Sequence, residues 1–273
     1  MSALLPCITT LFTCASLATA QNDWPLVWAD EFTVDGLPDS SSWRYDVGGG
    51  GWGNHELQYY TAERMQNVRI ENGLLIIEAH REKYQDRNYT SARLVSKRDW
   101  TYGRFEIRAR LPTGRGSWPA LWMLPTHDTY GEHYWPDNGE IDIIEHVGYE
   151  PDKVHSSVHT RAYHHSIGTQ KTNRLALADA STAFHVYAAR WTPGKIRFSV
   201  DGKHHFTFAN ERLTDADADY RQWPFDRPFH LLFNLAVGGS WGGAQGVAED
   251  IWPQQLQVDY VRVYQSPPAP PTK

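Results

Sequence analysis

Apolar and polar residues alternate along most of the chain, which is the pattern of strands that bury one face of a sheet. Between Phe105 and Leu111 the odd positions are apolar and the even positions are charged. The segments Phe229–Val237 and Val258–Tyr264 are predicted as further strands. Amphipathic helices are scarce, and the best candidate is a short stretch at Leu213–Arg221. The pattern therefore indicates an all-β protein.

Short turns separate several of these alternating runs. Asp201-Gly202 follows Ile196–Val200 and precedes another alternating run, and Asp-Gly tolerates the positive φ angles of a type I′ hairpin turn. Glu71-Asn72-Gly73 joins Val68–Ile70 to Leu74–Ala79 in the same way. Many short strands with frequent turns favour a β-sandwich.

The first 20 residues carry no charged side chain and end in Ala18-Thr19-Ala20. This ending is typical of a cleavage site, so residues 1–20 are predicted as a signal peptide. The mature chain is then expected to be secreted, extracellular or periplasmic, with no membrane anchor. Both cysteines, Cys7 and Cys14, lie in this segment, so the mature chain has no disulfide and needs a large core.

The composition agrees with one large β domain. Among the 273 residues are 12 Trp, 14 Tyr and 10 Phe, and aromatic side chains favour strands. We expect this domain at residues 21–265, followed by a Pro-rich tail at residues 266–273. The formal net charge is −6 and no basic stripe is present, which argues against a nucleic-acid partner. We expect a monomer that binds an uncharged carbohydrate.

The segment Gly139–Glu145 places three acids among isoleucines. In a strand, side chains two positions apart share a face, so Glu140 and Asp142 point the same way. Glu145 would point to the opposite face of a regular strand. One extra residue in a β-bulge at Ile143-Ile144 would return it to the face of the other two acids. We therefore predict a bulge here and three carboxyl groups in a row.

Three neighbouring carboxylates repel one another, which raises at least one pKa. Glycoside hydrolysis uses such an arrangement, because one carboxylate and one carboxylic acid must flank the scissile bond. In this interpretation Glu140 is the nucleophile, Glu145 is the acid and later the base, and Asp142 supports Glu140. The alternative is a solvated acidic strand face, which the spacing alone would favour. The nearby tryptophans favour the catalytic interpretation.

The segment 140–145 (EIDIIE) resembles the active-site strand of glycoside hydrolase family 16. The version of this strand with an extra bulge residue resembles that of the family's laminarinase-like members, which are endo-β-1,3-glucanases. Further similar segments follow in the family's order: Asp30–Phe32, Gly51–Tyr60, Ser91–Leu94, Trp118–Pro125, Asn234–Trp241 and Asp259–Tyr264. The resemblance implies a jelly-roll β-sandwich of two antiparallel sheets with a concave substrate cleft. It also implies a double-displacement mechanism that retains the anomeric configuration.

Several aromatic residues are candidates for sugar binding. An aromatic ring can stack on the apolar face of a sugar, which suggests Trp118 and Trp122, with core packing as the alternative. Trp241 lies among glycines, and glycine-rich backbone lets a ligand approach closely. His159 would lie on a strand beside Glu145, where a purely structural role is equally compatible.

Polar residues complete the set of substrate-binding candidates. Asn54, Glu56 and Gln58 alternate, so on an extended segment all three would point toward sugar hydroxyls. The alternative is a polar loop. By resemblance, Arg93 and Asn234 match positions where the family binds its substrate.

No cofactor is expected for catalysis. The 13 histidines include adjacent pairs whose side chains diverge on a strand, and no His-Glu-x-x-His motif occurs. By resemblance, Glu31 and Asp259 match family positions that hold a structural calcium ion together with backbone carbonyls. Two ordinary surface acids are the alternative. Asn88-Tyr89-Thr90 is an N-glycosylation sequon, which matters only in a eukaryotic source.

Three functions remain open from the sequence. The first is a secreted endo-β-1,3-glucanase, with mixed β-1,3/1,4-glucan as a further substrate. The second keeps this chemistry but acts on agarose, carrageenan or xyloglucan, since cleft loops decide the sugar. The third is a non-catalytic β-glucan-binding protein, because a fold does not fix a function. The presence of all three acids argues against this third function.

Overall fold

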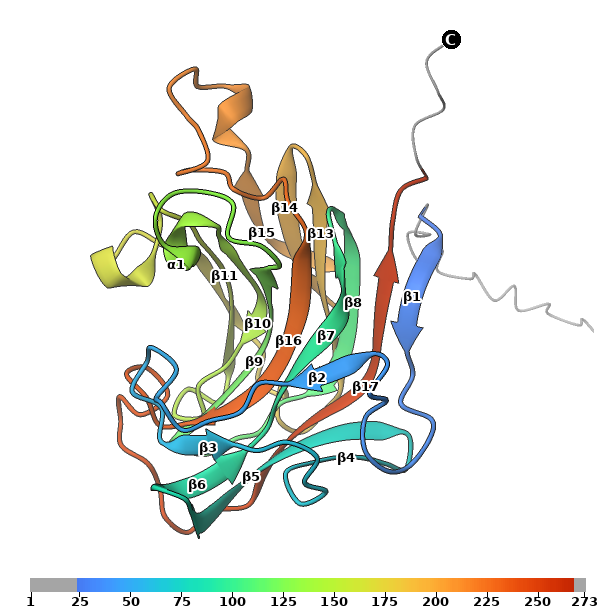
Figure 1. Ribbon diagram of the computed structural model, residues 1–273, viewed down its shortest axis with the longest axis vertical. Helices are drawn as coiled ribbons and strands as arrows, with labels where there is room; N and C mark the ends of the chain where they lie inside the picture. Colours follow the sequence, from blue (N-terminus) through green and yellow to red (C-terminus); the bar gives the residue numbers. More distant parts are fainter. Residues whose placement is uncertain (1–23, 268–273) are drawn as a thin grey trace, which may run out of the picture.

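The computed structural model describes residues 24–267. The predicted signal peptide and most of the predicted Pro-rich tail lie outside these residues. Within them the chain forms two curved β-sheets packed against each other (Figure 1). The predicted all-β sandwich is therefore confirmed. No helix in the described part of the chain is long and apolar enough to cross a membrane.

The outer sheet contains ten strands, in the order β15-β14-β13-β8-β17-β5-β6-β3, with β1 pairing with β17 and β4 pairing with β5. All its pairs are antiparallel except β3 with β6. Its strands are β1 Leu26–Asp30, β3 Gln58–Tyr60, β4 Val68–Glu71, β5 Leu74–Tyr84, β6 Arg87–Ser91, β8 Gly103–Arg110, β13 His185–Thr192, β14 Lys195–Val200, β15 Lys203–Ala209 and β17 Gln254–Tyr264.

The inner sheet contains seven antiparallel strands, in the order β12-β11-β10-β9-β16-β7-β2. Figure 1 shows that this sheet curves around the open side of the molecule. Its strands are β2 Trp43–Tyr45, β7 Arg93–Trp100, β9 Ser117–Pro125, β10 Glu140–Glu145, β11 Lys153–His159, β12 Lys171–Ala176 and β16 Phe229–Val237.

The hydrophobic core lies between the sheets because each strand directs alternate side chains inward. On β8, Phe105, Ile107 and Ala109 are completely buried, whereas the charged residues between them are partly exposed. On β9 of the inner sheet, Leu121 and Met123 enter the same core. The residues that alternate with them face the opposite side, so the concave face of the inner sheet is free to carry a binding site.

Both predicted turns form hairpins. Asp201 and Gly202 have φ angles of 50° and 75°, as a type I′ turn requires, and they connect β14 to β15. Asn72 and Gly73, with φ angles of 55° and 76°, connect β4 to β5. Local sequence therefore determines these two connections.

The predicted helix at Leu213–Arg221 is wrong, because this stretch forms a series of turns. The side chain of Asp215 accepts a hydrogen bond from the backbone N–H of Asp217, and Asp219 accepts one from the N–H of Arg221. Such local bonds compete with helix formation. The short helices among the described residues are α1 Tyr134–Asp137, η1 His165–Ile167 and η2 Glu211–Leu213.

Candidate active site

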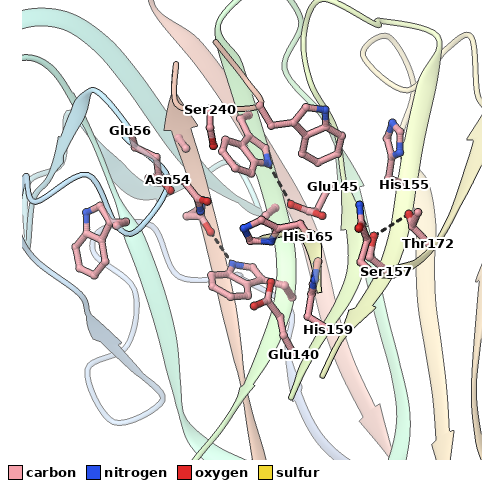
Figure 2. Close-up of a pocket in the computed structure, with 18 of the residues that line it drawn as sticks. Asn54, Glu56, Glu140, Glu145, His155, Ser157, His159, His165, Thr172 and Ser240 are labelled. Atoms are coloured by element: carbon pink, nitrogen blue, oxygen red, sulfur yellow. Dashed lines mark hydrogen bonds between the residues drawn. The ribbon is translucent and has the colours of Figure 1, made fainter. Parts of the chain in front are cut away.

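Strand β10 contains the predicted bulge. Asp142 pairs with Ser157 of β11, and Glu145 pairs with His155, so three steps along β10 match two steps along β11. The register against β9 shifts at the same place. As a result Glu140 and Glu145 both face the cleft, as Figure 2 shows. The predicted bulge is confirmed, and it brings the outer two acids of the row to one side of the sheet.

The concave face of the inner sheet forms the floor of a cleft of about 430 Å³ (Figure 2). Side chains from six of its seven strands line the cleft, together with residues of flanking loops. The lining residues are Trp52, Asn54, Glu56, Arg93, Trp118, Ala120, Trp122, Glu140, Glu145, His155, Ser157, His159, His165, Gln170, Thr172, Asn234, Ala236, Ser240 and Trp241.

Burial and mutual repulsion hold protons on two of the three acids. Desolvation raises the pKa of Glu145 to about 8, and the charge of Glu140 adds to this rise. The indole N–H of Trp118, 3.1 Å from Oε1 of Glu145, partly opposes it. Burial also raises the pKa of Asp142 well above its usual range, with both neighbouring acids contributing. Near neutral pH, Glu145 is therefore a proton donor that faces the cleft.

Glu140 contacts a tryptophan that was not among the predicted site residues. Trp135 donates its indole N–H to Oε2 of Glu140 at 2.6 Å. This residue belongs to α1, in the loop between β9 and β10. The buried Asp137 holds that loop by accepting hydrogen bonds from the N–H groups of Glu132 and His133 and from Arg161. The Trp-rich composition hinted at such a contact, but the direction of a loop side chain follows no strand periodicity.

The three predicted tryptophans all line the cleft. Trp118 and Trp122 are four residues apart on β9, so they share the cleft face as expected. Trp241 packs edge-on against Trp118, with ring centroids 5.6 Å apart. A Cβ atom on Gly242 would lie only 2.7 Å from Cβ of Trp118. At that position glycine is needed for packing against Trp118, and not for the close approach of a ligand that the sequence suggested.

A chain of hydrogen bonds connects the floor of the cleft to a buried carboxyl group. Trp122 donates its N–H to Oδ1 of Asn234 at 2.7 Å, and Nδ2 of Asn234 donates to the Tyr60 hydroxyl at 3.1 Å. The Tyr60 hydroxyl in turn lies 3.1 Å from Oε2 of Glu56, to which it donates. Desolvation raises the pKa of Glu56. Tyr60 is fully buried, and the sequence suggested it only as the last residue of the family-like segment Gly51–Tyr60.

The predicted sugar contact of Gln58 is wrong. Asn54 and Glu56 line the cleft, but Gln58 is fully buried and does not. Its amide donates to Glu56 at 2.6 Å and its carbonyl accepts the N–H of Val237 at 2.7 Å. Alternation predicts the side to which a residue points but not its depth: Gln58 contacts Glu56 as neighbours on one side do, yet it is covered by the surrounding chain. Gln58 therefore orients Glu56.

Arg93 and Asn234 line the cleft as predicted by resemblance. The guanidinium of Arg93 lies 4.8 Å from the ring centroids of both Trp52 and Trp122, and its Nε is 3.1 Å from Asp46. This placement between two aromatic rings fixes the cation at the cleft wall.

His159 also lines the cleft, but it lies opposite Glu140 in the register and not beside Glu145. The residue beside Glu145 is His155, whose pKa burial lowers to about 4. His155 and His165 were not predicted as site residues. The sequence does not distinguish these two histidines from the others. The pairing of β10 with β11 places His155 in the cleft, and the path of the β11–β12 connection places His165 there.

The predicted calcium ligands do not form an oxygen cluster in this structure. Both oxygens of Glu31 accept hydrogen bonds from Arg262, at 2.7 and 2.9 Å. Asp259 forms an ion pair with Arg108 at 2.5 Å. Two arginines therefore already neutralise these carboxylates, and this arrangement does not fit a cation site.

Comparison with known proteins agrees with the resemblance. The profile of glycosyl hydrolases family 16 matches residues 55–262. A β-glucanase of Rhodothermus marinus is 60% identical over 94% of this chain and 92% of its own length. A glucan endo-1,3-β-glucosidase of Cryptopygus antarcticus is 37% identical over 91% of this chain and 94% of its own.

The structural comparison leads to the same family. The X-ray structure of the laminarinase from Rhodothermus marinus matches with a TM-score of 0.88 and 63% identity, over 89% of this chain and 97% of that one. The predicted jelly-roll fold and the predicted class of enzyme, an endo-acting glycoside hydrolase, are confirmed. The chain belongs to glycosyl hydrolase family 16.

Proposed function

We propose that the chain is an endo-β-1,3-glucanase that cleaves internal β-1,3 bonds of laminarin-type glucans with retention of configuration. The observation that carries this proposal is the row of acids on β10 beneath a cleft lined by tryptophans. The names of the two relatives, β-glucanase and glucan endo-1,3-β-glucosidase, favour β-glucan as the substrate. Cleavage of mixed β-1,3/1,4-glucan is a further part of the proposal.

In the proposed mechanism, Glu145 donates its proton to the oxygen of the leaving sugar while Glu140 attacks the anomeric carbon. A glycosyl–enzyme ester forms on Glu140, and Glu145 then removes a proton from the water that hydrolyses it. Because its pKa is raised, Glu145 still carries this proton near neutral pH. Trp135 keeps the nucleophile in place through its hydrogen bond, and Asp142 lies two positions further along the same strand as its supporting neighbour.

The roles of the two glutamates can be tested with isosteric variants. Glu140→Gln should abolish turnover of laminarin while the protein still unfolds cooperatively. The exposed Glu249, 74% accessible and paired with Arg81, offers a matched control as Glu249→Gln. Near-normal activity of Glu140→Gln would refute the assignment. Proton NMR of the first products should show the retained anomer, and the inverted anomer would exclude a covalent intermediate.

The substrate is tested by product profiles of the purified chain on laminarin, lichenan, agarose and xyloglucan. Oligosaccharides from laminarin, with or without products from lichenan, support the proposal. Products from agarose or xyloglucan alone would instead favour the second function that the sequence left open. Tight binding of laminarin without products would favour the third.

Secretion and a monomeric state are also proposals. The uncharged apolar segment that ends in Ala18-Thr19-Ala20 supports secretion. Amino-terminal sequencing of protein recovered outside the cytoplasm should give Gln21 as the first residue. Size-exclusion chromatography with light scattering should give the mass of a single chain.

A further inference from the structure

Three side chains of the inner sheet bring possible metal-ligand atoms close together beside the cleft. One atom each of Glu140, Asp142 and His159 lies within 4.8 Å of the other two. Glu140 and His159 are direct partners across β10 and β11, and both line the cleft (Figure 2). Asp142 lies next to them on the same strand face and is only 1% exposed.

The contact between Asp142 and His159 is incomplete as a hydrogen bond. Nε2 of His159 lies 3.4 Å from Oδ2 of Asp142. Within the described residues, Oδ2 of Asp142 has no hydrogen-bond partner, although it is buried. A buried carboxyl oxygen without a hydrogen-bond partner is costly even on a protonated group, because neither water nor protein replaces the lost hydration, and a metal ion that displaced the proton would supply a partner.

The 3.4 Å between Nε2 of His159 and Oδ2 of Asp142 matches the spacing of two ligands of one metal ion, and the Glu140 atom, within 4.8 Å of both, would close toward the ion on binding. Zinc binds imidazole nitrogen and carboxylate oxygen at roughly 2.0–2.2 Å in a tetrahedral arrangement, which places ligand atoms roughly 3.3–3.6 Å apart. Trp135 occupies Oε2 of Glu140, so Oε1 remains for an ion. Glu140 and His159 line the cleft, so water can reach an ion from that side.

We propose that Glu140, Asp142 and His159 form a binding site for a divalent transition-metal ion of the zinc type, in competition with the glucan. The ligand set of one imidazole and two carboxylates favours zinc, copper or nickel, whereas calcium and magnesium prefer oxygen ligands alone. A bound ion coordinates the carboxylate of Glu140, which must attack the substrate. The site therefore makes the enzyme sensitive to such metals.

Metal binding itself does not depend on the proposed function, but the inhibition does rest on it. We therefore choose Co²⁺ as the probe, because its visible absorption reports tetrahedral coordination without any turnover. Titration of the purified chain should give one saturable band, and laminari-oligosaccharide should abolish this band. With laminarin as substrate, Co²⁺ and Zn²⁺ should raise KM and leave kcat unchanged.

Two variants separate this site from adventitious binding, since the chain contains 13 histidines. His159→Gln should weaken Co²⁺ binding at least tenfold. Glu140→Gln should also weaken Co²⁺ binding, because only Asp142 and His159 then remain as ligands. His204→Gln, which changes an exposed histidine of β15, should bind Co²⁺ like the parent chain. Circular dichroism confirms that each variant is folded.

Several results would overturn the proposal. One is equal Co²⁺ affinity in His159→Gln and the parent chain, and another is a band that persists although the same oligosaccharide binds to the metal-free chain. If the metal binds as expected but laminarin is not cleaved by the metal-free chain, the proposed function fails and the metal site stands. The two conclusions are therefore distinguishable.

Discussion

Glu145, the proposed proton donor, should lower the stability of the folded protein as the pH rises above 4.5. Its pKa rises from 4.5 to about 8 on folding, mainly because the carboxyl group loses hydration. Between these two values the folded state holds more protons than the unfolded state. The free energy of unfolding therefore falls as the pH rises through this window, and the loss is complete above the folded pKa. Glu145→Gln removes the titrating group and should remove this loss.

The size of the effect follows from the shift. A shift of one pKa unit corresponds to about 1.4 kcal/mol, so the full shift sets an upper limit of about 5 kcal/mol above pH 8. The side chain of Glu145 is partly open to the cleft, and solvent screening reduces this figure. We expect Glu145→Gln to be more stable than the parent chain by roughly 1–3 kcal/mol at pH 8, with almost no difference at pH 4.

Urea unfolding of both proteins at several pH values between 4 and 9 measures this difference directly. Glutamine keeps a carbonyl oxygen that can accept the N–H of Trp118, so the variant preserves that contact. Glu249→Gln on the surface should show no comparable dependence on pH. A stability gain that stays constant across the range, or a variant that is less stable at pH 8, would contradict the assignment of a desolvated, protonated Glu145.

Two further predictions concern activity. Because Glu145 must carry a proton to act as the acid, kcat/KM on laminarin should fall as the pH rises through about 8, and a profile of kcat/KM that stays flat to pH 10 would disprove this. Tyr60→Phe removes the hydroxyl that links Asn234 to Glu56, so it leaves buried polar atoms unpaired at a cost of about 1–3 kcal/mol. It should raise KM more than it lowers kcat, and steady-state kinetics with an unchanged KM would show that this bond does not position the cleft.

The sequence was most informative where the chain is extended. Alternation located the strands at Phe105–Leu111 and Ile196–Val200, because the side-chain period of two is a property of the backbone itself. The same rule showed that Glu145 would face away unless Ile143-Ile144 formed a bulge, and the register shift confirms this reasoning. Gln58 was misplaced because alternation gives direction and not burial: Gln58 contacts Glu56 but is completely buried.

By itself, the sequence determined the β class, two hairpin turns and the face on which three acids meet, because these depend on residues a few positions apart. The tertiary structure alone decided which groups surround those acids. Trp118 reaches Glu145 across 27 positions of sequence, and Trp135 reaches Glu140 from a loop. Burial, and with it the raised pKa of Glu145, depends on every element packed around a side chain, so no local pattern of residues could specify it.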